Sequence, residues 1–183
     1  QPEGDWGFWR GERWPTGDLV RFALAASSND AIAAAAESLG ADYIATINSQ
    51  AYTLGLRKTN VLNPTGLDES ESMAGGYGSA RDMATLAATF MRQYPTYFEA
   101  TSASYVTISH AGRMLTATST AGPLLDIPGL IGAKTGFTDL AGGNLVAAFD
   151  IELGRPIVIA VLGSTRDGRF ADVKTLIEAT RRK

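Results

Sequence analysis

The spacing of apolar residues predicts two helices near the start of the chain. Apolar residues recur at helical intervals between Thr16 and Gly40, and a polar junction from Ser27 to Asp30 divides the segment into two helices. We expect Thr16 to cap the first helix and Ser28 or Asn29 to cap the second, because short hydroxyl and amide side chains accept hydrogen bonds from free backbone N–H groups.

Two further helices are predicted in the first half of the chain. One covers Ala41 to Leu54 and is followed by a glycine-rich loop from Asn60 to Gly78. The other begins after Ser79, which stands three residues before Asp82 in a capping-box-like arrangement, and ends at Pro95.

The second half of the chain changes to the shorter period of β-strands. A hairpin is expected from Tyr105 to Ile108 and Met114 to Thr118, turning at Ala111-Gly112. Three more strands and a closing helix are predicted at Gly132 to Thr138, Asn144 to Asp150, Pro156 to Gly163, and Asp167 to Arg181. Most of the predicted helices lie in the first half of the chain and the predicted strands in the second half. This order predicts an α/β (α+β) fold, with a helical region and an antiparallel sheet.

Composition narrows the class of protein. The chain has 183 residues, 45% of them hydrophobic, and a formal net charge of -3, which fits one globular domain over 1–183 without a basic face for nucleic acid. It has no cysteine, so thiol chemistry is excluded. The first residues do not have the pattern of a signal peptide, and the apolar stretch from Ile157 to Leu162 is too short to cross a bilayer.

The distribution of basic side chains points to a lysine rather than a histidine as the catalytic base. His110 is the only histidine, and it falls in a predicted turn, where we expect it to be solvated. Neither a histidine-rich metal site nor a Ser-His-Asp triad is therefore expected. A lysine whose pKa is lowered by burial or by a neighbouring cation is the remaining common base.

Lys134-Thr135-Gly136 has the residue types that such chemistry needs. Thr135 offers a hydroxyl to a carboxylate, Gly136 leaves room for a substrate backbone beside the strand, and the backbone N–H of Phe137 can face an oxyanion. Alone, this tripeptide is a weak signal, because a lysine in a turn is commonly solvated. Ser27-Ser28-Asn29 is weaker still, because these residues are ordinary helix caps.

Taken together, the motifs resemble the D-alanyl-D-alanine carboxypeptidases, which are low-molecular-mass penicillin-binding serine peptidases. The resemblance covers nearly the whole chain. It is carried by Ala26-Ser27-Ser28-Asn29-Asp30-Ala31, Asn63-Pro64-Thr65-Gly66-Leu67, Ser79-Ala80-Arg81-Asp82, Gly132-Ala133-Lys134-Thr135-Gly136-Phe137-Thr138 and Ala141-Gly142-Gly143-Asn144-Leu145-Val146.

The resemblance implies a penicillin-binding/β-lactamase-like transpeptidase fold and hydrolysis of peptidoglycan stem peptides ending in D-Ala-D-Ala through an acyl-enzyme. By the same resemblance, Ser27 relays a proton to the leaving D-alanine and Asn29 holds the catalytic lysine and a substrate amide. Lys134 and Thr135 receive the terminal carboxylate, Gly136 lies along the substrate and Phe137 supplies an oxyanion N–H. No metal or cofactor is implied, β-lactam antibiotics are expected ligands, and the location is expected to be extracytoplasmic.

The chain departs from the family at the nucleophile. No serine has a lysine three residues after it, and the segment before Ser27 contains no serine at all. We therefore expect 1–183 to be an incomplete catalytic domain that lacks the family's N-terminal strands and is inactive alone, with the missing N-terminal segment as a partner. A non-catalytic module that binds the same peptide remains an alternative. A class A β-lactamase is less favoured, because its glutamate-bearing loop is not recognisable and Thr138 fits the carboxypeptidase pattern.

Two smaller groups of residues are left open. The aromatic residues Trp6, Phe8, Trp9 and Trp14 are expected to cover the core, with sugar stacking as the alternative. Arg166 and Arg169 follow the last strand and are either solvated or positioned to bind a carboxylate.

Overall fold

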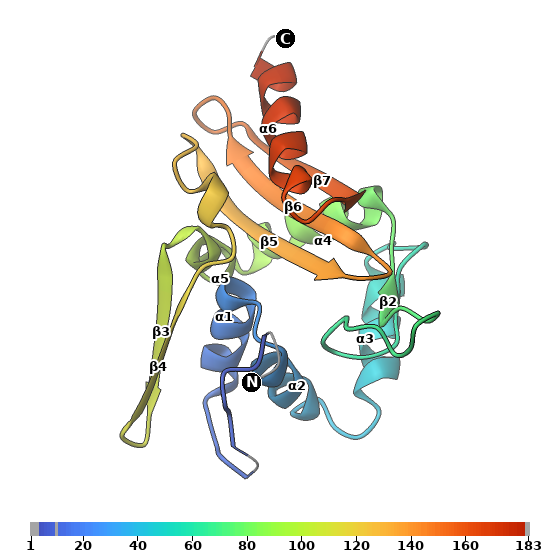
Figure 1. Cartoon of the computed structure of the whole chain (residues 1–183), viewed down its shortest axis with the longest axis vertical. Helices are drawn as coiled ribbons and strands as arrows, with labels where there is room; N and C mark the ends of the chain where they lie inside the picture. The colour runs from blue at the N-terminus through green and yellow to red at the C-terminus, as the bar shows by residue number, and fades with distance from the viewer. Residues whose placement is uncertain (1–3, 10, 182–183) are drawn as a thin grey trace.

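The computed structural model describes residues 4–9 and 11–181, and Figure 1 shows how their helices and strands are arranged. The helices are α1 (Thr16–Ala26), α2 (Asn29–Glu37), α3 (Tyr43–Thr53), α4 (Ala80–Gln93), α5 (Pro95–Glu99) and α6 (Gly168–Arg181). The strands are β1 (Asn60–Val61), β2 (Gly76–Tyr77), β3 (Tyr105–His110), β4 (Arg113–Thr118), β5 (Leu130–Thr138), β6 (Gly142–Asp150) and β7 (Pro156–Ser164). None of the helices in this part of the chain is long and apolar enough to cross a bilayer.

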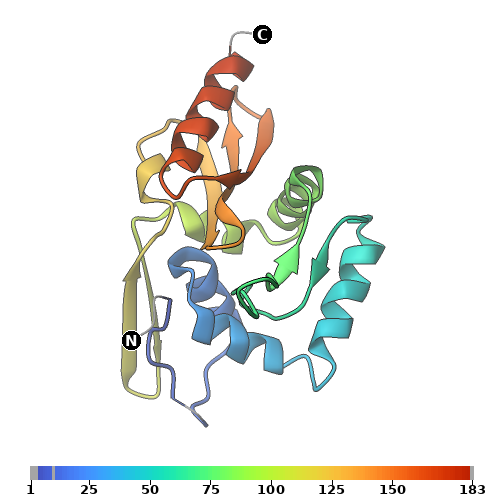
Figure 2. The same cartoon turned by 45° about the vertical axis from the view of Figure 1, so that its right-hand side comes forward.

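The main sheet is antiparallel, with the strand order β5-β6-β7. Successive β6 side chains point to opposite faces, so Ala147 packs with α6 while Ala148 packs with α4. The two helices therefore cover opposite faces of the sheet (Figure 2). Within the described residues β7 pairs only with β6, which leaves its outer edge unpaired.

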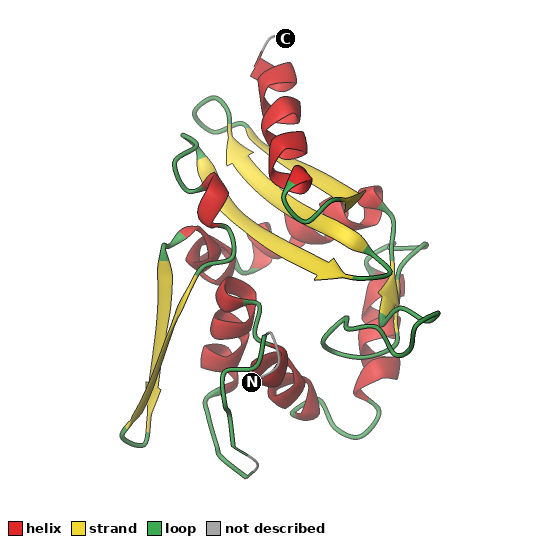
Figure 3. Cartoon of the chain, in the orientation of Figure 1, coloured by secondary structure: helices red, strands yellow, loops and turns green. Residues whose placement is uncertain are grey.

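A second core lies between α1, α2 and the β3–β4 hairpin, which Figure 3 shows as strands separate from the main sheet. Phe22 of α1 and Ile108 of β3 are its largest fully buried side chains. The alanines of α2 permit close approach, and Ala31 is completely buried there. This core fixes the C-terminal end of α1, where the Ser27 junction begins.

The predicted helices and strands of both halves are present, and the α/β fold class is confirmed. Two local predictions were wrong, those for the cap at Thr16 and for the loop from Asn60 to Gly78. Thr16 is the first residue of α1, and Pro15 occupies the cap position without a side-chain hydrogen bond. Helix α4 ends before Pro95 as predicted, and the fixed φ of Pro95 also suits the first position of the short α5. The glycine-rich loop contains the short β1–β2 pair.

Candidate active site

Ser27 and Lys134 are in direct contact although 107 positions separate them along the chain. The Lys134 Nζ atom donates a hydrogen bond of 2.7 Å to Ser27 Oγ and a second of 2.5 Å to the carbonyl oxygen of Thr135. The α1–α2 junction thus meets the middle of β5. The two polar clusters singled out in the sequence share one site.

The backbone at the end of α1 explains why Ser27 points toward β5. Ser27 has a left-handed conformation, with φ 54° and ψ 43°. A non-glycine residue in this region costs on the order of 1 kcal/mol, and such residues concentrate at functional sites. Ser28, which is buried, then caps α2 by accepting a 3.1 Å hydrogen bond from the N–H of Ala31. The two adjacent serines therefore have different tasks, one facing Lys134 and one starting α2.

Lys134 has an unusual environment for a lysine. Burial of its ammonium lowers the pKa from 10.5 to about 8, and the positive charge of Arg169 adds to the lowering. The residue as a whole keeps partial exposure, and burial of the ammonium is the larger cause of the lowered pKa. Because this pKa lies near neutrality, Lys134 can both carry a positive charge at pH 7 and exchange a proton with Ser27.

Asn29 is the first residue of α2 and lies against the N-terminal segment. Its N–H donates a 2.7 Å hydrogen bond to the carbonyl oxygen of Gly4. A Cβ atom at Gly4 would stand only 2.4 Å from Asn29 Nδ2, so glycine is needed at this contact. The backbone of Gly4 therefore restricts the position of the Asn29 amide.

Asp30 joins the same segment to the start of α2. Its Oδ2 atom accepts hydrogen bonds from three consecutive backbone N–H groups, those of Trp6, Gly7 and Phe8, at 2.7, 2.9 and 3.2 Å. Its other oxygen, Oδ1, accepts a 2.5 Å hydrogen bond from Ser28 Oγ. Asp30 thus anchors the N-terminal segment that flanks Asn29.

Thr135 is buried and its hydroxyl is engaged within the protein. Thr135 Oγ1 donates to Thr120 Oγ1 at 2.8 Å, and the Thr120 N–H donates to the carbonyl oxygen of Ala25 at 3.0 Å. Thr120 therefore ties β5 to the last turn of α1. The sequence analysis did not identify Thr120, because the residues that flank it form no recognisable catalytic or binding motif.

Gly136 and Phe137 continue β5 beyond the lysine. A Cβ atom at Gly136 would meet only Asn144 Cβ, at 3.8 Å, so packing within the protein does not demand glycine there. The Phe137 side chain is partly exposed, and the Arg166 guanidinium lies over its ring at 4.5 Å.

Arg169 is part of this site and is not a solvated surface residue. It is only 9% exposed, and its Nη1 atom donates a 2.5 Å hydrogen bond to the carbonyl oxygen of Gly136. Its Nε atom is buried without a partner among the described residues. The sequence was compatible with either solvation of Arg169 or carboxylate binding by it. Burial could not be read from the sequence because it depends on α6 packing against the sheet.

The long loop before α4 also reaches the site region. Asn63 shapes its turn, because Asn63 Oδ1 accepts hydrogen bonds from the N–H groups of Thr65 and Gly66. Asp68 Oδ2 then accepts a 3.1 Å hydrogen bond from the N–H of Leu140, in the turn between β5 and β6. The loop is thereby linked to the end of the lysine-bearing strand.

The arrangement supplies a proton relay and a cationic anchor. A buried lysine with a lowered pKa, a serine hydroxyl 2.7 Å away and a neighbouring arginine can protonate a leaving group and attract a carboxylate. Within residues 4–9 and 11–181, no group of three or more acidic or histidine side chains could hold a metal ion.

Solved structures place this fold among the penicillin-binding proteins. A D-alanyl-D-alanine carboxypeptidase from Mycobacterium tuberculosis H37Rv superimposes with a TM-score of 0.82 at 28% identity, over 95% of this chain and 67% of that chain. Penicillin-Binding Protein D2 from Listeria monocytogenes, in its ampicillin-bound form, gives a TM-score of 0.79 at 33% identity, over 92% and 69%.

Sequence comparison identifies the family. The family described as D-alanyl-D-alanine carboxypeptidase matches residues 8–166. DacA of Haemophilus influenzae is 33% identical over 88% of this chain, and DacF of Bacillus subtilis is 30% identical over 92%. The chain belongs to the D-alanyl-D-alanine carboxypeptidase family. It spans 40% and 43% of the length of these two relatives.

Proposed function

We propose that residues 1–183 form the larger, C-terminal part of the catalytic domain of a serine-type D-Ala-D-Ala carboxypeptidase that acts on peptidoglycan stem peptides. The observation that carries this proposal is the 2.7 Å hydrogen bond from Lys134 to Ser27, since it joins the two motifs on which the family's chemistry depends. The proposed catalytic residues are Ser27, Asn29 and Lys134. The proposed substrate-binding residues are Thr135, Gly136 and Phe137.

The proposed mechanism requires a nucleophilic serine from a Ser-x-x-Lys segment, which this sequence does not contain. When that serine attacks the penultimate carbonyl, its hydroxyl proton passes to the lysine of the same Ser-x-x-Lys segment, and as the peptide C–N bond breaks the leaving D-alanine nitrogen takes a proton from Ser27 Oγ. Lys134 Nζ replaces this proton through the existing hydrogen bond. A lysine pKa of about 8 suits this transfer, because the ammonium is present at pH 7 yet gives up its proton readily.

We assign recognition of the substrate carboxylate to the positively charged side chains of the site, Lys134 and Arg169. Lys134 and Thr135 receive the carboxylate, and the buried guanidinium of Arg169 contributes a second positive charge. The hydroxyl of Thr135 exchanges its bond to Thr120 for one to the ligand. The absence of any packing demand for glycine at 136 supports a role in leaving space for the substrate backbone.

Partners and location follow from the same proposal. β-Lactams are ligands because they occupy the same acyl-donor position, and ampicillin is bound in the Listeria relative. The proposed partner is a segment that carries the nucleophile, and the edge of β7 that is unpaired among the described residues offers it a strand-pairing surface. An extracytoplasmic location follows from a peptidoglycan substrate.

The test is reconstitution of activity. The chain is expressed downstream of the Ser-x-x-Lys segment of a relative such as Bacillus subtilis DacF, and D-alanine release from an acyl-D-Ala-D-Ala peptide is measured. We expect labelling by a fluorescent penicillin and D-alanine release from the fusion only. Ser27→Ala and Lys134→Ala fusions should remain folded and lose most of both activities.

The competing function is a module that binds the peptide without turnover, which is favoured by the lack of Ser-x-x-Lys in the sequence. A fusion that binds the peptide but releases no D-alanine would support the module. Covalent labelling of the isolated chain by penicillin would show instead that another residue acts as the nucleophile.

A further inference from the structure

Trp9 differs from the other aromatic residues of the N-terminal segment. Trp6 and Phe8 contact the Phe22 ring at centroid distances of 5.6 and 5.8 Å, and Trp14 contacts Phe8 at 5.5 Å. These three cover the core as the sequence predicts. Trp9 is 70% exposed, so the prediction was wrong for this residue.

The exposed indole is held in place by a residue from the distant hairpin. The Arg113 guanidinium lies over the Trp9 ring at 4.4 Å. Arg113 is itself fixed by hydrogen bonds of 2.5 Å to Glu12 Oε2 and to the carbonyl oxygen of Gly7. Glu12 also accepts a 3.0 Å hydrogen bond from the N–H of Trp9. The network thus displays a large apolar ring in one orientation on the surface.

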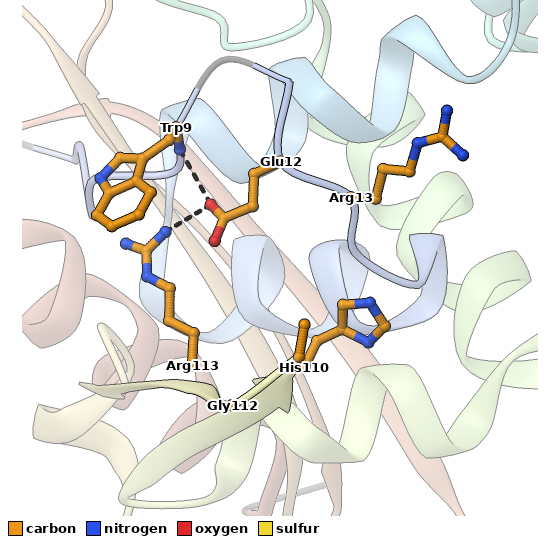
Figure 4. Close-up of a pocket in the computed structure, with 7 residues that line it drawn as sticks. Trp9, Glu12, Arg13, His110, Gly112 and Arg113 are labelled. Atoms are coloured by element: carbon orange, nitrogen blue, oxygen red, sulfur yellow. Dashed lines mark hydrogen bonds and ion pairs between the residues drawn. The ribbon is translucent and has the colours of Figure 1, made fainter.

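A hollow of about 450 Å³ lies beside this network, between the N-terminal segment and the hairpin turn. The hollow is a shallow depression that opens to solvent. Figure 4 shows Trp9 and Arg113 on one side of it, Arg13 on the other, and the Glu12 carboxylate between them. His110 lines the floor.

The charges of the hollow leave one cation available to a ligand. Glu12 pairs with Arg113, whereas Arg13 makes no ion pair within the part of the chain that the structure describes. Burial acts to raise the pKa of Glu12, but its hydrogen bonds to Trp9 and Arg113 outweigh this and lower the pKa below the usual value. Glu12 is therefore an ionised acceptor at neutral pH.

We propose that this hollow binds a sugar ring that carries a carboxylate close by, as the sugar-proximal part of a peptidoglycan stem does. The apolar face of the ring stacks on Trp9, sugar hydroxyls donate to Glu12, and the carboxylate pairs with Arg13. The identity of the ligand rests on the proposed function.

The position of the hollow agrees with a ligand that also reaches Ser27. Arg13 lies just before α1 and Ser27 just after it. The 11 residues of α1 span about 16 Å. An extended peptide of about five residues covers about 17 Å. One short peptide can therefore join a sugar in the hollow to a terminus at Lys134.

The experiment uses two muramyl dipeptides that differ in one group. N-acetylmuramyl-L-alanyl-D-glutamine, which has one carboxylate, and its D-glutaminamide counterpart, in which that carboxylate is an amide, are titrated into the isolated chain, with affinity measured by calorimetry. The Trp9 indole N–H resonance, assigned with Trp9→Phe, reports the place of binding. We expect the acid to shift this resonance and to bind about five- to tenfold more tightly than the amide, as a charge-assisted pair allows.

Variants separate stacking from charge recognition. Trp9→Ala should weaken both ligands about fivefold or more, and Arg13→Gln should remove the difference between acid and amide. Tyr105→Ala and Arg92→Gln are matched controls, since both original side chains are exposed elsewhere, and they should bind like the unmodified chain.

Two outcomes would overturn the proposal. One is the absence of saturable binding, and the other is binding that Trp9→Ala and Arg13→Gln leave unchanged. Lys134→Ala should not affect binding of these dipeptides, which lack the D-Ala-D-Ala end. Failure here is therefore distinguishable from failure of the carboxypeptidase proposal, which is tested by D-alanine release.

Discussion

The ammonium of Lys134 donates a 2.7 Å hydrogen bond to the hydroxyl of Ser27, which stands in a left-handed backbone conformation at the end of α1. The contact has a free-energy cost for each partner, because Lys134 is desolvated and Ser27 has a strained backbone conformation. Such strained and desolvated groups persist where the surrounding structure holds them in place. Here α1 is held by packing against the hairpin core, and β5 is held by pairing with β6.

Replacement of Lys134 should weaken peptide binding. In Lys134→Ala, the affinity for diacetyl-Lys-D-Ala-D-Ala should fall about 10- to 100-fold, because a hydrogen bond to a charged group contributes about 1.5–3 kcal/mol. Calorimetry on the isolated chain measures the change. Lys174→Ala removes an exposed lysine of α6 and should have no effect. Equal losses for a peptide amidated at its C-terminus would contradict carboxylate recognition.

Peptide binding should depend on pH through Lys134. Since its pKa is about 8, affinity should be constant between pH 6 and 7 and then decrease about tenfold per pH unit well above 8 as the ammonium loses its proton. Affinity is measured from pH 6 to 10. The Lys134→Ala variant should show no such decrease, and a parallel decrease in this variant would assign the dependence to another group.

The same pKa predicts a rise in stability at alkaline pH. Between about 8 and 10.5, the unfolded chain holds the Lys134 proton and the folded chain does not. The unfolded state then binds more protons, so the free energy of unfolding increases with pH, by at most about 3 kcal/mol from this group. Urea unfolding at pH 7 and pH 9.5 compares the chain with Lys134→Met. A change with pH that is identical in both would contradict the lowered pKa.

Gly4→Ala should disturb Asn29, and Gly11→Ala is its matched control. Both glycines have positive φ, 91° and 85°, so alanine strains both by about 1 kcal/mol. Only at Gly4 would the new Cβ collide with Asn29, because nothing lies within 4 Å of the corresponding point at Gly11. Peptide affinity should fall about tenfold in Gly4→Ala alone, as a displaced binding group predicts. Similar affinities in the two variants would remove Asn29 from the binding site.

Asp30→Asn should loosen the N-terminal segment. Loss of the charged acceptor for the N–H groups of residues 6–8 should cost about 1–3 kcal/mol, and their amide hydrogen exchange should accelerate. Asp42→Asn is the control, because Asp42 stands before α3 without a side-chain capping bond. Unchanged exchange at residues 6–8 would show that other contacts hold this segment.

The sequence alone determined the longer helices and strands and which residues are candidates for chemistry. Ser79 marks the start of α4, and the alternation around Ala111-Gly112 marks the β3–β4 hairpin, because caps and side-chain periods act over a few residues. The breadth of the motif resemblance also indicated the family before any contact was known.

Only the tertiary structure decided which of these residues meet and how each is charged. The Ser27–Lys134 contact, the Thr120–Thr135 bond and the burial of Arg169 arise from packing between segments far apart in the chain. Trp9 is exposed and in contact with Arg113, about a hundred positions later. Long-range contacts of this kind leave no local pattern, since desolvation and Coulomb interactions depend on distances in space and not on spacing along the sequence.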